Sequence, residues 1–276
     1  MAPSVSICLP VYNGARFLKI AIESVLSQTY TDYELIICDD CSGDNTLEIA
    51  RSFGDPRIKV YKNEKNLGLV GNWNRAFSYA HGKYVKLMMQ DDILHADAIA
   101  KQVELLEMHP EASICIGNTS VINELGEVVV ERRRFKKDGV ISGIKFAKKT
   151  LMGRNLYCEP PNVMLRNELI KKIGPIDDSF TYAPDWDYCL SMSSIGDVAY
   201  TKTKIMDFRI SDISETSRVF NKKNGATTLS DSDKMFLKHF NAKIIPLNIF
   251  NYIIFRVVIR VMAFARVIIL KIRKKR

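Results

Sequence analysis

The sequence has little of the chemistry that builds structural metal sites or disulfide frameworks, with only four histidines and six cysteines. The histidines lack the spacing of a metalloprotease motif, and Cys38 and Cys41 form an isolated Cys-x-x-Cys without a second ligand pair. The cysteines are scattered over expected strands, loops and helices, which favours free thiols in a reducing compartment. We therefore expect neither a structural zinc ion nor stabilising disulfide bonds.

The sequence also lacks internal repeats, low-complexity linkers and, at its start, the basic stretch and long apolar run of a secretory signal. Hydrophobic residues make up 47% and charged residues 26% of the 276 residues, which is typical of globular proteins and argues against wholesale disorder. A chain of this length buries a large core as one α/β domain, alone or with an appendage.

Acidic residues are missing from residues 246–276, which contain eight basic ones. Residues 1–245 carry 32 basic and 31 acidic side chains, so nearly all of the formal charge of +9 belongs to this tail. The basic residues of the tail stand among aliphatic side chains on an otherwise neutral protein. This pattern does not favour nucleic-acid binding.

The first 120 residues alternate short apolar runs with segments of helical periodicity. The runs at 4–10, 33–40, 57–63, 83–90 and 112–118 predict strands, and 17–28, 45–53, 70–80 and 97–109 predict helices. Two short helices and two more strands are expected between residues 166 and 210. The alternation predicts an α/β fold with a mostly parallel, Rossmann-like central sheet flanked by helices.

Two of the expected strands end in paired carboxylates, Asp39 with Asp40 and Asp91 with Asp92. Ligands of open parallel sheets bind beyond the carboxyl ends of the strands, so the four carboxylates are expected at one edge. A single pair has a simpler explanation, because aspartate also caps the helix that follows. Two pairs at corresponding strand ends favour a divalent cation held together with substrate phosphates.

Four stretches, at residues 6–46, 66–94, 160–180 and 183–190, resemble the family 2 glycosyltransferases, which are inverting enzymes of the GT-A fold. The resemblance covers roughly residues 4–210 and includes several motifs in the family's order. It implies that the ligand is a nucleotide-diphosphate sugar, with a UDP-sugar favoured. The Q-x-x-R-W segment of processive synthases is absent, so the resemblance implies transfer of one sugar at a time, as in synthesis of bacterial surface polysaccharides.

The resemblance also implies a nucleotide site around the first strand ends. The matching positions are Pro10, Val11 and Tyr12 around the base, Asp39 and Asp40 at the base and ribose, Asn66 and Gly68 in a nearby loop, and Asp91.

Asp91 and Asp92 match the end of the family's metal-binding D-x-D element, but Met89 stands where many members have its first aspartate. The resemblance therefore implies that Mn²⁺ or Mg²⁺ is held by Asp91 and Asp92 alone, either of them being the direct ligand. Ser211 stands where many relatives have a histidine, which leaves a further metal or phosphate contact open.

For the chemical step, Asp185 matches the family's catalytic base, which removes the proton from the acceptor hydroxyl. Pro184 replaces the acidic residue that commonly precedes it. Asp187 is the alternative base, and a helix-capping role is the alternative for Asp185.

We expect an inverting glycosyltransferase that uses a glycan or a lipid-linked acceptor. The departures at Met89 and Ser211 leave an alternative, a membrane-bound nucleotide-sugar binding protein without catalysis. A nucleotidyltransferase that makes sugar nucleotides is disfavoured, because residues 10–17 lack that class's glycine-rich basic signature.

The basic tail predicts a separate membrane-association segment at residues 231–276, following a glycosyltransferase domain at residues 1–230. Residues 247–270 are long enough to span a bilayer, but Arg256, Arg260 and Arg266 interrupt the apolar run. The pattern favours an amphipathic helix in the membrane interface over a spanning helix or an ordinary core helix. We therefore expect a peripheral protein on the inner face of the cytoplasmic membrane.

Overall fold

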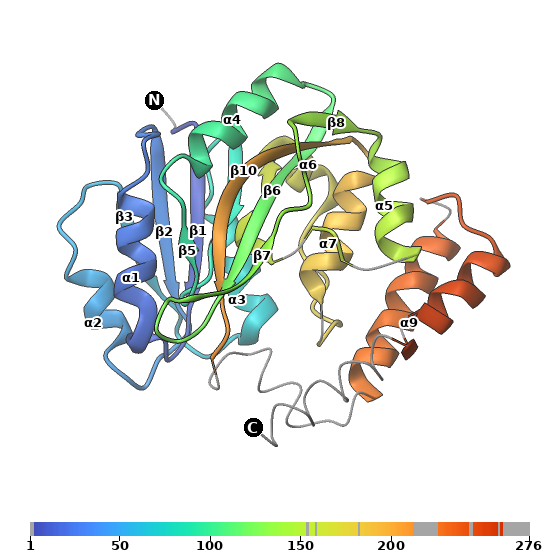
Figure 1. Cartoon of the computed structure of the whole chain (residues 1–276). Helices are drawn as coiled ribbons and strands as arrows, with labels where there is room; N and C mark the ends of the chain where they lie inside the picture. The colour runs from blue at the N-terminus through green and yellow to red at the C-terminus, as the bar shows by residue number, and fades with distance from the viewer. Residues whose placement is uncertain are drawn as a thin grey trace.

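The computed structural model describes residues 3–152, 155–157, 159–181, 183–211, 226–242, 245–258 and 260–261. In this part of the chain one mixed sheet of ten strands lies between two layers of helices (Figure 1). The strands are β1 (Val5–Val11), β2 (Tyr33–Asp39), β3 (Ile58–Lys62), β4 (Tyr84–Leu87), β5 (Ile93–Leu94), β6 (Ala112–Ile122), β7 (Val128–Arg132), β8 (Gly139–Ile141), β9 (Met164–Arg166) and β10 (Asp197–Arg209). The helices are α1 (Ala15–Leu26), α2 (Thr46–Arg51), α3 (Gly68–Ser78), α4 (Ala98–Met108), α5 (Gly143–Met152), η1 (Pro160–Asn162, a 3₁₀ helix), α6 (Asn167–Ile173), α7 (Pro184–Ser193) and α9 (Ala226–Asn241).

The strand order is β3-β2-β1-β4-β9-β6-β10-β5, with β7 paired to β6 and β8 to β10. The half formed by β3, β2, β1 and β4 is entirely parallel, as predicted. The other half is mixed, because the short strand β9 lies antiparallel between β4 and β6. Residues 197–209 form the single strand β10 instead of the two expected strands, with an irregularity between Tyr200 and Lys204.

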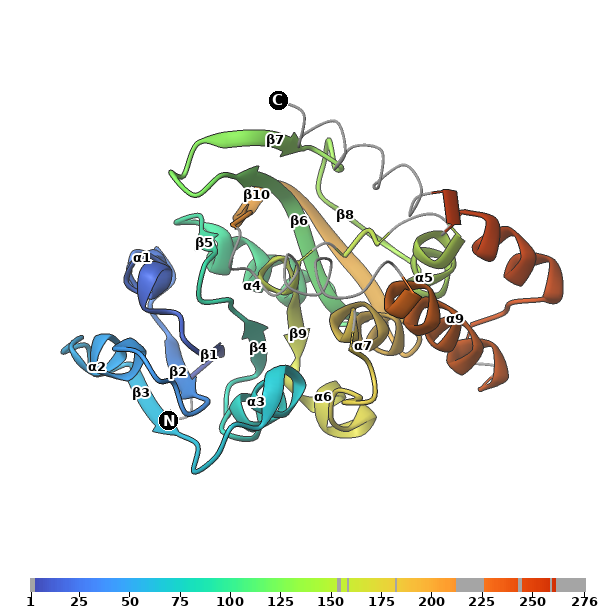
Figure 2. The same cartoon turned by 90° about the horizontal axis from the view of Figure 1, so that it is seen from below.

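The buried strands explain why the apolar runs of the sequence are continuous. Every residue of β1 and of β2 is buried, as is typical of strands covered by helices on both faces. One core layer contains α1 and α4, with Ile22 and Leu106 fully buried, and the other contains α3, α7 and α9, with Trp73 and Phe236 buried. Figure 2 shows α1 and α4 on one side of the sheet and α3 and α6 on the other.

Two glycines end elements where a side chain would be strained. Gly126 has φ of 85° in the β6–β7 hairpin, and Gly174 has φ of 91° directly after α6. Only glycine adopts this left-handed region readily, so both positions favour glycine. The five cysteines in the described part of the chain are free thiols, as expected.

The beginning of the basic tail packs on the domain core. Residues 249–258 are helical, and Phe255 is fully buried with its ring 4.9 Å from that of Phe236 in α9. Arg256 forms an ion pair with Asp233 at 3.3 Å, so this arginine faces α9. Within the described ranges, no helix has the length and apolar character needed to cross a bilayer. Residues 262–276, with Arg266, lie outside the described residues.

Candidate active site

The carboxyl ends of β1, β2 and β4 meet at one edge of the sheet. Val11 at the end of β1 is in parallel register with Asp39 at the end of β2. The next residue, Tyr12, donates its N–H to Gln90 Oε1 at 2.8 Å, and Gln90 Nε2 donates to the Tyr12 carbonyl at 3.1 Å. A Cβ atom on Gly14 would lie 2.3 Å from Gln90 Oε1, so this contact requires glycine. The paired bonds join the loop after β1 to the loop that carries the second aspartate pair.

Asp40 organises the start of α3. Its Oδ1 accepts hydrogen bonds from the Leu67 N–H and the Asn63 amide, both at 2.8 Å, and its Oδ2 accepts from the Gly68 N–H at 3.0 Å. Asn66 adds a bond from its Nδ2 to the Asp40 carbonyl at 3.1 Å. Asp40 therefore acts as a remote cap that satisfies N–H groups at the beginning of a helix. Its carboxylate, predicted to bind nucleotide, is already occupied by protein donors.

Asp39 is placed differently from its neighbour. Its Oδ2 accepts the Ser42 N–H at 3.2 Å, whereas its Oδ1 is buried and has no hydrogen-bond partner within the described chain. Pro10 and Val11 lie beside it in β1, and the side chain of Tyr12 is 41% exposed. The free carboxylate oxygen and the accessible aromatic ring lie at the strand ends where a nucleotide base was predicted.

Asp91 and Asp92 follow β4, and Arg209 at the end of β10 holds them. Asp92 is 1% exposed, and its Oδ1 accepts the Arg209 N–H at 2.9 Å, while Arg209 Nε donates to the Asp91 carbonyl at 2.9 Å. Burial raises the pKa of the Asp91 carboxyl. Burial, together with the neighbouring Asp91 charge, raises the pKa of the Asp92 carboxyl well above its ordinary value.

The donor set at this aspartate pair suits a hard divalent cation. Asp92 Oδ2 is buried without a hydrogen-bond partner in the described part of the chain, and the adjacent carboxylates repel each other. No group of three or more histidine, cysteine, aspartate or glutamate side chains suited to a metal is present among the described residues. A cation here would thus have two carboxylates from the protein, the number that Mg²⁺ uses together with substrate phosphates and water.

Asp185 lies in the first turn of α7, where the preceding Ala183 adopts a left-handed conformation and Pro184 begins the helix. The side chain is partly buried and borders a small apolar cavity of about 20 Å³, lined also by Trp73 and Tyr188. Burial raises the pKa of Asp185 to about 7, against the lowering effect of the helix N–H groups. A carboxylate with this pKa is suited to accept a proton near neutral pH.

Asp187 has a different environment. It is 2% exposed, and its carboxylate contacts Lys238 Nζ at 2.6 Å and His239 Nε2 at 3.0 Å. Lys238 also contacts Asp177 at 3.0 Å. Both oxygens of Asp187 are therefore committed to α9, and the residue connects α7 to α9.

One further carboxylate, Glu159, stands directly before η1 and was not predicted from the sequence. One of its oxygens contacts Arg132, and the other is buried without a hydrogen-bond partner in the described chain. Its charge adds to the raised pKa of both Asp92 and Asp185, so it lies near both carboxyls. Arg209 was also missed. Neither residue belongs to a local motif, and only the tertiary fold brings them to this edge.

Comparison with known proteins agrees with this geometry. The family model described as glycosyl transferase family 2 matches residues 6–174. An uncharacterized glycosyltransferase of Rickettsia typhi is 28% identical over 80% of this chain and 68% of its own length. Escherichia coli WfgD, named as a UDP-Glc:α-D-GlcNAc-diphosphoundecaprenol β-1,3-glucosyltransferase, is 39% identical over 43% of this chain. The putative glycosyltransferase EpsE of Bacillus subtilis is 38% identical over 45% of this chain.

The alignments with WfgD and EpsE span slightly less than half of those proteins, 47% and 46% of their lengths. Among solved structures, residues 1–349 of S. aureus TarS in complex with UDP-GlcNAc superpose with a TM-score of 0.67 at 17% identity, covering 87% of this chain and 73% of that chain. This likeness confirms the predicted GT-A fold. The family model covers more than half of the sequence, and the chain belongs to glycosyl transferase family 2.

Proposed function

We propose that the protein transfers one sugar from a UDP-sugar to a hydroxyl of a glycan or lipid-linked acceptor, with inversion, in bacterial surface-polysaccharide synthesis. The observation that carries this proposal is the contrast on α7. Asp185 borders a cavity with a pKa of about 7, whereas both oxygens of Asp187 are bound to α9. Family membership, the UDP-GlcNAc complex of TarS and the activity for which WfgD is named support the donor and acceptor classes.

The nucleotide is assigned to the edge formed by β1 and β2. Tyr12 packs on the base, and Asp39 accepts a hydrogen bond from the base or ribose through its free Oδ1. Asp40 supports this site indirectly, because it holds the loop of Asn66 and Gly68 in place. This division refines the prediction that both aspartates contact the nucleotide.

Asp92, with its unpartnered Oδ2, and the adjacent Asp91 would hold a divalent cation together with the diphosphate. Such a cation supplies Lewis-acid stabilisation of the charge that develops on the leaving diphosphate. Arg209 holds this pair in place, because its Nε donates to the Asp91 carbonyl and its backbone N–H donates to Asp92 Oδ1. The protein thus fixes both aspartates before any ligand binds.

Asp185 takes the proton from the acceptor hydroxyl as its oxygen attacks the anomeric carbon from the face opposite the diphosphate. The apolar neighbours Trp73 and Tyr188 limit water at the base and keep its pKa close to working pH. Attack from the opposite face inverts the configuration of the anomeric carbon.

We also propose that the helical residues 249–258 and 260–261 dock on the inner face of the cytoplasmic membrane. Their exposed apolar side chains recur every three or four positions, at Ile249, Phe250, Ile253, Val257 and Val261, each at least 55% exposed. This spacing forms one apolar face, as expected of an interfacial helix. The face lies opposite the one that contacts α9, so the membrane contact is assigned to these apolar residues and not to Arg256.

The test is a screen of UDP-, GDP- and dTDP-sugars for thermal stabilisation with Mn²⁺ and with chelator, followed by product analysis with lipid-linked and soluble glycan acceptors. We expect stabilisation by a UDP-sugar in Mn²⁺ and a product whose anomeric configuration is opposite to that of the donor. Donor binding without transfer to any acceptor, and without donor hydrolysis, would favour the non-catalytic alternative. A product that retains the configuration would refute the role given to Asp185.

A further inference from the structure

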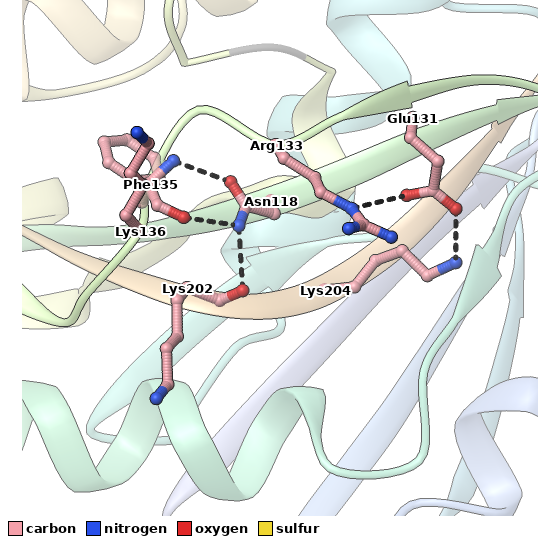
Figure 3. A pocket seen from close by; sticks show the side chains of 7 residues that line it. All are labelled: Asn118, Glu131, Arg133, Phe135, Lys136, Lys202 and Lys204. Carbon is pink, nitrogen blue, oxygen red and sulfur yellow. Dashed lines mark hydrogen bonds and ion pairs between the residues drawn. The ribbon is translucent and has the colours of Figure 1, made fainter.

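A basic pocket of about 520 Å³ lies on β6, β7 and β10, some distance from the paired aspartates (Figure 3). Four cationic side chains and one carboxylate line it, so its lining carries three net positive charges. The lining residues are Asn118, Glu131, Arg133, Phe135, Lys136, Lys202 and Lys204. Lys204 precedes Arg209 by five residues in β10, which is roughly 16 Å along the strand. No lining residue was placed in the candidate active site, although Arg132, which contacts Glu159, stands between Glu131 and Arg133 in the sequence.

The chain segment after β7 is held firmly in this pocket. Asn118 Oδ1 accepts the N–H groups of Arg134 and Phe135 at 2.7 and 2.9 Å. Its Nδ2 donates to the carbonyls of Phe135 and Lys202 at 2.9 and 2.8 Å. The ring of Phe135 stacks on Tyr200 with the centroids 4.7 Å apart. These bonds fix two cationic segments, one after β7 and one in β10, against each other.

The cations of the pocket are only partly compensated. Glu131 is shared between Lys204 at 3.5 Å and Arg133 at 3.9 Å, and Lys204 also contacts Asp207 at 3.5 Å. Lys136 and Lys202 make no ion pair with any described residue. Figure 3 shows the Arg133 and Lys204 head groups next to the Glu131 carboxylate, while the ammonium groups of Lys136 and Lys202 extend away from them in opposite directions. Long lysine stems rotate readily, so both groups can turn toward an anion that enters the pocket.

An apolar surface adjoins these charges. Val128, Val129 and Val130 of β7 are 51%, 50% and 46% exposed. The pairing of β7 with β6 shifts register between Val130 and Val128, so Val129 stands at a bulge just before Glu131 of the pocket. Charged residues alone would be enough to keep the edge strand β7 from pairing with another strand. They would not account for exposed valines next to Lys202 of β10, which has no ion-pair partner among the described residues. The combination matches a ligand with an anionic head and an apolar chain.

We propose that this pocket binds the phosphate headgroup of an anionic lipid, whose acyl or prenyl chain lies over Val129 and the exposed face of β7. Arg133 and Lys204 provide the inner cations, and Lys136 and Lys202 close on the phosphate from either side. The valines give a lipid an advantage over free phosphate. The proposal concerns binding alone and does not depend on the transfer reaction.

The test measures binding to the full chain in chelator, so that metal-dependent donor binding does not contribute. The probes are short-chain phosphatidic acid below its micelle concentration, the matching phosphatidylcholine, and inorganic phosphate. We expect phosphatidic acid to bind at least about tenfold more tightly than either of the other two. Inorganic phosphate binding as tightly as phosphatidic acid would overturn the lipid assignment.

The triple substitution Arg133→Gln, Lys136→Gln and Lys202→Gln should weaken binding of phosphatidic acid at least about tenfold, the effect of losing one charge-assisted hydrogen bond. The control removes the same charge elsewhere, by replacing the exposed residues Lys145, Lys171 and Lys172 with Gln. Thermal unfolding checks that both variants are folded. Equal weakening in the two variants would show only unspecific charge attraction and would overturn the pocket.

Discussion

Replacing Asp185 with Asn should lower transfer while it raises stability, a combination that only a buried base produces. The loss of a general base costs roughly 10²-fold or more in turnover. Donor binding should stay within a few fold, because the paired aspartates and the strand ends are unchanged. A residue that only caps the helix would instead lose stability on substitution.

The stability effect follows from the sign of the pKa shift. The pKa of Asp185 is raised from its ordinary value of 3.8 to about 7 in the folded protein. The contribution of Asp185 to the free energy of unfolding is therefore fully present below about pH 4. It is lost as the pH rises to about 7, because the carboxyl ionises at a lower pH in the unfolded chain than in the folded protein. The shift of about three pKa units sets an upper limit of roughly 4 kcal/mol. Solvent at the partly exposed carboxyl reduces this to about 1–2 kcal/mol.

The assay combines denaturant unfolding of both proteins at pH 5 and pH 8 with a pH profile of kcat/KM. Asp185→Asn should be the more stable protein at pH 8, with a smaller advantage at pH 5. Wild-type kcat/KM should rise as the pH increases through about 7, since the base must be ionised. Asp187→Asn serves as the matched control and should lose stability, because Lys238 then lacks its buried partner. Near-normal turnover in Asp185→Asn would refute the assignment of the base.

Three further predictions concern other parts of the protein. Asp92→Ala should weaken UDP binding in Mn²⁺ but not in chelator, whereas Asp39→Ala should weaken it in both; calorimetry that gives the same losses for both variants would contradict this division. Asp40→Ala should destabilise the protein by about 2–3 kcal/mol in denaturant unfolding, because the N–H groups at the start of α3 lose their acceptor, and an unchanged midpoint would show that water replaces it. Asp substitutions of Ile253 and Val257 should prevent sedimentation with anionic liposomes without lowering donor binding, while unchanged sedimentation would exclude this helix face.

The parallel half of the sheet was predictable because its signals are local. The runs that became β1 and β2 are buried on both faces and therefore mostly apolar. Asp39 and Asp92 were recognisable because each stands at the end of such a run. Strand β9 and the continuity of β10 were not, since a three-residue strand and an irregular register depend on their neighbours.

Roles that depend on long-range contacts were also beyond the sequence. Asp39 and Asp40 are adjacent and chemically identical, yet one is saturated by donors near residue 67 and the other keeps a free oxygen. In the same way, no spacing rule distinguishes Asp185 from Asp187, because the difference arises from Lys238 and His239 some fifty residues later. The amphipathic pattern of the tail likewise does not indicate that Arg256 pairs with Asp233, because that partner belongs to another helix.

The connection between α7 and α9 has a consequence for acceptor choice. Asp187 is bound to Lys238 of α9, and Phe236 of the same helix packs on Phe255 of the helix proposed to dock on the membrane. These contacts leave little freedom between the catalytic helix and the docking face. In the docked enzyme, Asp185 would then stay at one fixed distance from the bilayer. Acceptors would be selected by how far their reactive hydroxyl stands from the lipid anchor, so the length of the glycan already built would decide which sugar is added next.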